Sequence, residues 1–257
     1  MAFSTGTLSA LNGVLADINM PNPLGSTALV ESNAPVVRAR ALSVAGEGSD
    51  CVRAVRLHDH VRDQVPFGIA RHYWRVPASR ALEAPCLHGV PKAHLLCALL
   101  RAVNIPARLR FVSVDAGVFS GLLALPSPRI DHALVEVWLQ ERWVACDSFQ
   151  MDAAAFERAR AVLRAAGRTF GLGIHVDGRI EWTGSAPSFC LLVTGGPDAL
   201  PPVLDLGVHA DASALYAESR PGASPPSLAT RLGWRMLAGG ANRRLAELHA
   251  AAVAGTA

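Results

Sequence analysis

The chain has 257 residues, of which 51% are hydrophobic and 18% charged, with a formal net charge of +3. That is enough apolar material for a buried core in a single domain over residues 1–257, and it excludes a mainly disordered chain. The basic residues are dispersed along the sequence, which argues against a nucleic-acid partner. The chain has no uncharged apolar run of about 18 residues and no signal-like N-terminus. We therefore expect a cytoplasmic protein without a membrane partner.

The five cysteines are an odd number, and none of them stands in a Cys-x-x-Cys motif. This pattern favours free thiols and predicts neither a metal site nor a cofactor. The sequence His58-Asp59-His60 resembles a cluster of metal ligands. Adjacent and i,i+2 positions of a helix point apart, however, so we do not expect it to bind a metal.

The first half of the chain contains two predicted helices. Residues 1–48 contain Pro21, Pro23 and Pro35 and are expected to be irregular, and Ser49 or Asp50 can cap a helix that runs to about Gln64. Residues 90–103 are apolar nearly all round, which predicts a central, buried helix. Asn104 is typical of a left-handed helix cap. A strand is expected over 108–114.

A β-hairpin is predicted over residues 131–149, with its turn at Gln140-Glu141. A two-residue turn pairs positions whose numbers add to a constant. His132 and Asp147 then form a diagonal pair on one face of the sheet, about 7–8 Å apart at the backbone. Their side chains can close that gap.

The C-terminal half is predicted in less detail. Asp152 can cap a helix that ends at about Ala166. A second hairpin is expected over 174–182, and a wrapping loop over 195–226. Two terminal helices are expected over 227–237 and 241–253, separated at Gly239-Gly240.

Three stretches together resemble the transglutaminase-like superfamily of papain-type thiol acyl-transfer proteins. They are VPKA with LLCALLRA within 90–102, IPAR at 105–108, and DHALVEVW with RWVACD within 131–147. The resemblance implies an α+β fold with a papain-like transglutaminase core over about 50–185, in which the central helix packs on an antiparallel sheet. Residues 186–257 would then be a C-terminal loop and helical extension. It also implies a catalytic role for His132 with Asp147.

One position departs from the family pattern. The family's nucleophilic Cys stands three residues before the Lys of the central helix, and Gly89 occupies that position before Lys92. A helix N-terminus offers N–H groups and partial positive charge, which would activate a thiol and bind an oxyanion. Gly89 keeps the N–H groups, removes the thiol and is expected to open a space beside His132.

Four interpretations remain open. The first is a modified enzyme in which His132 and Asp147 perform acyl transfer or cyclisation on a small molecule above Gly89. The second is that Cys86, three residues upstream, replaces the missing nucleophile. The third is an inactive protein that binds a ligand in the old cleft. The fourth is that Gly89 is an engineered change that traps a substrate complex.

The remaining candidates surround this centre. His88, Phe119 and Trp138 are predicted to bind the substrate, which is a small molecule or a carrier-bound acyl group. The uncharged segment 116–128 is either a lid over an apolar substrate or a short helix packed on the core. Lys92 is expected to extend its amine to solvent at the helix start. The structural interpretations are a core histidine for His94, an ion pair for Glu136, and core packing for Cys51, Cys97 and Cys146.

Overall fold

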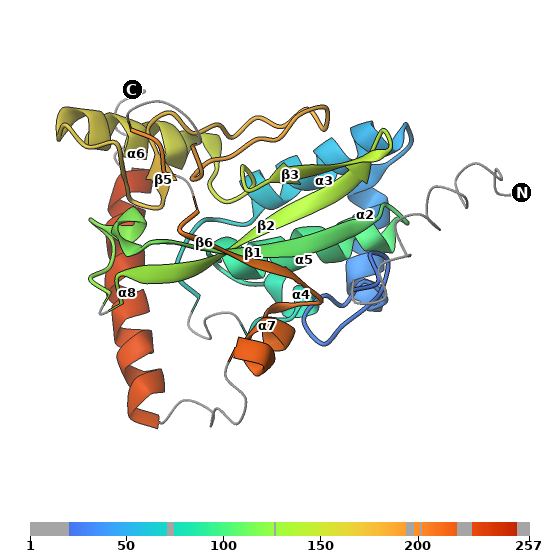
Figure 1. The fold of residues 1–257 in the computed structure, drawn as a ribbon, viewed down its shortest axis with the longest axis horizontal. Helices are drawn as coiled ribbons and strands as arrows, with labels where there is room; N and C mark the ends of the chain where they lie inside the picture. The colour runs from blue at the N-terminus through green and yellow to red at the C-terminus, as the bar shows by residue number, and fades with distance from the viewer. Residues whose placement is uncertain are drawn as a thin grey trace, which may run out of the picture.

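The computed structural model describes residues 21–70, 75–125, 127–193, 198–200, 202–219 and 228–250. An antiparallel four-stranded sheet lies at its centre, in the order β3-β2-β1-β6 (Figure 1). The strands are β1 (Ala107–Asp115), β2 (Arg129–Leu139), β3 (Arg142–Cys146) and β6 (Leu204–His209). The expected α+β fold with an antiparallel sheet is confirmed.

Helix α5 (Gly89–Ala102) is the central helix, and it packs on strands β1 and β2. Its residues from Gly89 to Arg101 are all buried, as the apolar pattern around the whole helix predicts. Three further helices pack against α5, so that it is enclosed between them and the sheet. They are α2 (Pro35–Ala45), α3 (Asp50–Gln64) and α4 (Ala78–Ala81).

The hairpin of β2 and β3 has the predicted register. Leu139 pairs with Arg142 and Val135 with Cys146, and both turn residues, Gln140 and Glu141, have positive φ (50° and 61°). Positive φ at both central positions is the two-residue turn that matches the twist of paired strands. This register sets His132 and Asp147 on a common face.

The predicted helix ends are also confirmed. Ser49 Oγ accepts the backbone N–H of Val52 at the start of α3, and Asp152 caps α6 (Ala153–Ala165) through the N–H of Ala155. Asn104 has a φ of 62° just after α5. Each cap satisfies backbone groups that a helix end leaves without partners.

The N-terminal segment is more regular than expected. The expectation of irregular structure over 1–48 was wrong for α2, which begins at Pro35. Proline is favoured in the first helical turn because the N–H that it lacks has no helical partner there. Part of this expectation, residues 1–20, lies outside the described residues.

The C-terminal half corrects several expectations. Strand β6 and helix α7 (Ala212–Ser219) replace the expected loop, so the predicted extension contributes a strand to the central sheet. Helix α8 (Leu228–Ala250) runs unbroken through Gly239-Gly240. Its apolar side packs on α6, which outweighs the intrinsic cost of glycine in a helix (Figure 1).

The second predicted hairpin was also wrong. The short strand β5 (Ile174–His175) pairs with the preceding β4 (Phe170–Gly171) and not with residues beyond Gly178. Gly178 does form a turn, because its N–H bonds to the carbonyl of His175. A turn signal after an apolar run does not say which neighbouring segment that run will pair with.

Candidate active site

His132 and Asp147 form the buried centre of the site. His132 Nε2 lies 3.0 Å from Asp147 Oδ2, and both side chains are almost fully buried. The second carboxylate oxygen of Asp147 accepts the backbone N–H of Cys190, so the carboxylate is held from both sides. When Nε2 carries the proton and donates it to Asp147, the Nδ1 atom of His132 is left as a base.

Gly89 is the first residue of α5 and faces the His132 ring. A Cβ atom built on Gly89 would lie 3.4 Å from His132 Cε1. Our expectation that Gly89 stands at a helix N-terminus beside the imidazole is therefore confirmed. Its φ is not positive, so the backbone conformation at this position does not require glycine.

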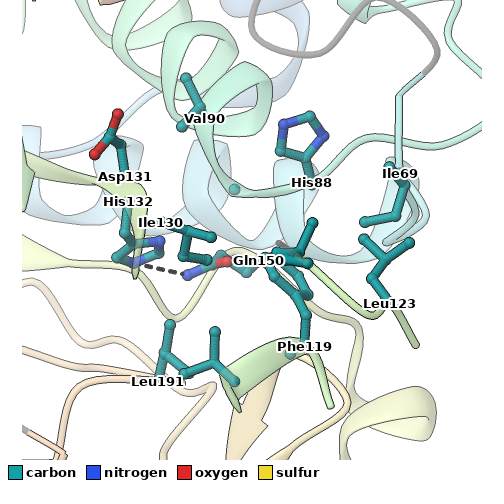
Figure 2. A pocket seen from close by; sticks show the side chains of 14 residues that line it. Ile69, His88, Val90, Phe119, Leu123, Ile130, Asp131, His132, Gln150 and Leu191 are labelled. Carbon is teal, nitrogen blue, oxygen red and sulfur yellow. Dashed lines mark hydrogen bonds between the residues drawn. The ribbon is translucent and has the colours of Figure 1, made fainter. Parts of the chain in front are cut away.

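The space above Gly89 is filled and not open, contrary to our expectation. The side-chain oxygen of Gln150 lies 2.7 Å from the Cβ position that Gly89 lacks. Gln150 Nε2 is 3.1 Å from His132 Nε2, and the residue is 4% exposed. The carboxamide of Gln150 thus occupies the place of a side chain at position 89 and contacts the imidazole directly (Figure 2).

Sequence reasoning missed Gln150 because it lies in no regular strand or helix. It is three residues beyond Asp147, in the turn that follows β3, where its N–H bonds to the carbonyl of Asp147. A polar residue so soon after a candidate catalytic carboxylate was the one available signal.

A pocket opens in front of His132, Gly89 and Gln150 (Figure 2). Its lining also includes His88, as predicted, together with Asp131 and Gly173. The remaining lining is apolar: Ile69, Val90, Val118, Phe119, Leu123, Leu125, Ile130 and Leu191. The site is therefore a mostly apolar pocket with its polar groups at one end.

The segment over 116–125 forms one wall of this pocket. It begins with a short 3-10 helix (Ala116–Phe119), and Val118, Leu122 and Leu123 are buried. The interpretation of a short helix packed on the core is confirmed, and the segment also lines the pocket. Ile69 lies beside Leu123 (Figure 2), and the carboxamide of Asn242 in α8 bonds to both its N–H and its carbonyl.

Lys92 is buried, and the expectation that its amine reaches solvent was wrong. Its Nζ donates to the carbonyls of Arg62 (3.3 Å), Val65 (2.6 Å) and Gln150 (2.9 Å). Burial lowers the pKa of Lys92 to about 7, while three carbonyl acceptors favour the ammonium form, which alone has three donors. Lys92 thus joins the end of α3 to the backbone of Gln150.

Burial also changes the titration of His88. It lines the pocket at 5% exposure, and its Nδ1 accepts the N–H of Ala70. Burial, with smaller contributions from His94 and His132, lowers the pKa of His88 to about 3. His88 is therefore neutral near pH 7.

Two predicted site residues lie away from the pocket lining. A Cβ on Gly68 would come within 2.6 Å of the Cβ and Sγ atoms of Cys86, which places that side chain against Gly68. Trp138 is near the far end of β2, where its ring packs on Trp143 at 5.2 Å between centroids. The prediction that Trp138 binds substrate is not supported, because the Trp138 side chain does not belong to the pocket lining.

The structural interpretations agree with the observed contacts. Glu136 forms ion pairs with Arg108 and Arg110. His94 is fully buried and accepts the backbone N–H of Ala212. Cys97 and Cys146 are buried, whereas Cys51 is half-buried and donates to the carbonyl of Thr183. In the part of the chain that the structure describes, no three or more His, Cys, Asp or Glu side chains are grouped to hold a metal ion.

The chain is similar to one known protein family and to a solved structure. Residues 38–148 match the family model of the transglutaminase-like superfamily. A solved structure from Cytophaga hutchinsonii, provisionally assigned as a cysteine protease, matches with 14% identity and a TM-score of 0.44. The match covers 75% of this chain, and the chain spans 47% of that structure's length. No curated protein matches the chain.

Among the described helices, none combines the length and hydrophobicity needed to cross a lipid bilayer. The family match includes Gly89 and both members of the buried His132–Asp147 pair. The resemblance first indicated by the sequence motifs is confirmed by this family match, which covers residues 38–148 and thus less than half of the chain.

Proposed function

We propose that this protein is an acyl-transfer or cyclisation enzyme that acts on a small molecule without a cysteine nucleophile. The observation that carries the proposal is the 3.0 Å contact between His132 and Asp147 at the polar end of an apolar pocket. A buried carboxylate that orients an imidazole leaves the other ring nitrogen available for proton transfer.

The proposed reaction uses a nucleophile supplied by the substrate or by water. His132 Nδ1 takes the proton of a hydroxyl, amine or water as that group attacks an acyl carbonyl. The new bond to the carbonyl carbon forms, and the bond to the leaving group then breaks. The leaving group receives the proton from His132, so the imidazole is neutral again at the end of the cycle.

Helix α5 supports the charge that develops on the carbonyl oxygen. Gly89 and Val90 begin the helix, and Val90 lines the pocket with Gly89. N–H groups at a helix start, together with the helix dipole, favour negative charge nearby. Because the carboxamide of Gln150 occupies the space above Gly89, a carbonyl reaches these N–H groups when that side chain rotates away.

A second candidate function is ligand binding without catalysis. The observation that favours it is the Gln150 carboxamide, which fills the position where the family's nucleophile would stand. In that case the His132–Asp147 pair is a structural remnant and the pocket holds an unreacted ligand. Cys86 is a weaker candidate because its side chain packs against Gly68 and does not line the pocket.

The experiment that separates these functions uses acetyl and propionyl thioesters of N-acetylcysteamine, with water or a tethered amine as the nucleophile. The wild type is compared with His132→Ala and Asp147→Asn, and His60→Ala serves as a control at a histidine of α3 that contacts Arg40. We expect His132→Ala to lower turnover by about 100-fold or more. No turnover by the wild type, or equal turnover by wild type and His132→Ala, would contradict an enzymatic role for His132.

A further inference from the structure

The pocket wall opposite the His132 side has the chemistry of an acyl-chain site. Phe119, Leu123 and Ile69 form this wall (Figure 2), and the lining also includes the apolar side chains of Leu125 and Leu191. Burial of methyl and methylene groups against such a surface is favourable, because it removes apolar area from water. This wall therefore favours a hydrocarbon group.

The charges around the pocket argue against a charged ligand. Asp131 lines the pocket, and the carboxylate of Asp147 lies behind His132. No Lys or Arg occurs in the described lining, since the nearby Lys92 directs its amine to three backbone carbonyls. A ligand carboxylate would lie near the Asp131 carboxylate with no Lys or Arg side chain in the described lining to balance it, and an ammonium group would lose its hydration against apolar side chains.

The size of the pocket limits the ligand further. Its volume is about 70 Å³. A cavity of about 150 Å³ holds benzene, so the space here corresponds to roughly three non-hydrogen atoms. An acetyl group has three such atoms and a propionyl group has four. Longer chains would have to displace Leu123 or Phe119 or extend out of the pocket.

Gln150 supplies the polar recognition group. Its carboxamide is almost fully buried, touches His132 and has both donor and acceptor capacity. A rotation of this amide would let its N–H₂ group donate to a ligand carbonyl placed above Gly89. Because Lys92 fixes the Gln150 backbone, only the side chain would need to move.

We propose that the pocket selects a short, uncharged acyl group of acetyl to propionyl size, with its carbonyl on Gln150 and its alkyl end between Phe119 and Leu123. This inference rests on the proposed function, because it takes the acyl carbonyl as the reacting group. It assigns specificity-determining roles to Gln150 for the carbonyl and to Leu123 for chain length.

The test measures binding separately from turnover. Unreactive amides of two to eight carbons, from acetamide to octanamide, are titrated into isotope-labelled protein and followed by NMR shifts of the pocket backbone amides. We expect the tightest binding at two or three carbons. Propionate and propylammonium, which match the amide in length, should bind at least about tenfold more weakly than propionamide.

Variants locate the specificity. Leu123→Ala should move the preferred length toward four to six carbons, whereas Leu204→Ala, at an exposed leucine of β6, should leave it unchanged. Gln150→Met, which keeps a side chain of similar length but loses the carboxamide, should weaken the binding of propionamide by about tenfold. The circular dichroism spectrum and urea midpoint of each variant show whether it is folded.

The outcomes separate the two proposals. Amide binding with the expected length and charge preference, but no turnover of the thioesters, would overturn the proposed reaction and leave this inference standing. Turnover without a preference for short uncharged groups would do the reverse. Equal binding of propionate and propionamide, or a length preference that Leu123→Ala does not move, would overturn the inference.

Discussion

Two buried histidines of this fold have similar hydrogen bonds and very different surroundings. His132 contacts the carboxylate of Asp147 at 3.0 Å. His58 contacts Asp59 Oδ1 at 2.9 Å through Nδ1, and Ser148 Oγ at 2.8 Å through Nε2. By distances alone, Ser148, His58 and Asp59 resemble a serine hydrolase triad more closely than the His132 site does.

Access separates the two arrangements. His58 and Ser148 are 0% exposed, and neither belongs to the pocket lining. The His58 ring packs against Phe149 and Trp182, with centroids 6.2 Å and 5.3 Å apart. His132 lines the pocket instead. Hydrogen-bond geometry is thus insufficient evidence for catalysis, because a reacting group also needs space for a substrate.

The fully buried His58 has a structural role: it holds the turn that follows β3 and contains part of the site. Ser148 lies between Asp147 and Gln150, and its hydroxyl ties this turn to α3 through His58. Lys92 ties the same turn to α5 through the carbonyl of Gln150. These two contacts keep the Asp147 carboxylate and the Gln150 amide in place beside His132.

The largest effect that we expect is on stability, when the buried contacts of His58 are removed. His58→Ala leaves a cavity beside Trp182 and removes the partner of the Ser148 hydroxyl. The free energy of unfolding should therefore fall by about 2–4 kcal/mol. Urea unfolding at pH 7 measures this change, with His60→Ala as the control on the same helix. A change below about 0.5 kcal/mol would mean that His58 does not anchor the turn.

A second effect follows from burial of a neutral histidine away from the pocket. Burial lowers the pKa of His94 from 6.5 to about 4. As the pH falls below 6.5, the unfolded chain gains a proton at His94 while the folded chain does not, so stability decreases. The contribution is fully present above about pH 7, and about 2 kcal/mol of it is lost at pH 5.

Urea midpoints at pH 7.5, 6 and 5 test this expectation. His94→Gln should be less stable than the wild type at pH 7.5 but should lose less stability on acidification. His88, whose pKa burial lowers to about 3, acts in the same direction and remains in both proteins. Equal acid sensitivity of wild type and His94→Gln would contradict the assigned role of His94.

A third, smaller effect concerns position 89 in the pocket region. Gly89→Cys should cost about 1 kcal/mol, the lower end for overpacking, because its side chain meets the flexible amide of Gln150. The thiol would stand at a helix N-terminus beside His132, which should lower its pKa. We expect rapid iodoacetamide labelling below pH 8, and faster labelling still in Gly89→Cys with Gln150→Ala, where the space is open.

The pH dependence of labelling decides the outcome. An ordinary thiol profile with a pKa near 8.5 in both variants would show that His132 and Asp147 do not act on position 89. A normal profile in the single variant and a lowered pKa in the double variant would identify Gln150 as the group that isolates position 89 from the imidazole.

The sequence predicted the parts of the site that follow from periodicity and spacing. The two-residue turn at Gln140-Glu141 was sufficient to bring His132 and Asp147 together, whereas the place of Gly89 beside them was implied by the family resemblance. A helix is determined by a local apolar pattern, and a hairpin by its register. The register decides which side chains share a face, because side chains alternate between the two faces along a strand.

The parts that the sequence did not predict depend on contacts between distant segments. Gln150 reaches His132 from an irregular turn, and Asn242 reaches Ile69 from a helix 173 residues away along the chain. Strand β6 joins β1 across a long connection from a segment rich in Pro, Gly, Ala and Ser. No local periodicity encodes such pairings, so propensity alone indicated a loop.

The smallest effect that we expect is at Cys86, and it tests which region carries the chemistry. Cys86 lies in the segment that pairs with 66–68 through the bridge between Phe67 and Leu87, and its side chain packs on Gly68. To act as a nucleophile, its sulfur would have to leave this contact and reach the pocket in which His88, two residues later, already lies. Cys86→Ala should therefore change thioester turnover by less than about twofold, with Cys51→Ala, at another half-buried thiol, as the matched control. Two results together would contradict this expectation: a loss of turnover comparable to that of His132→Ala, and alkylation of Cys86 that bound substrate prevents. They would identify Cys86 as the nucleophile in place of a substrate group and would show that this segment rearranges when the substrate binds.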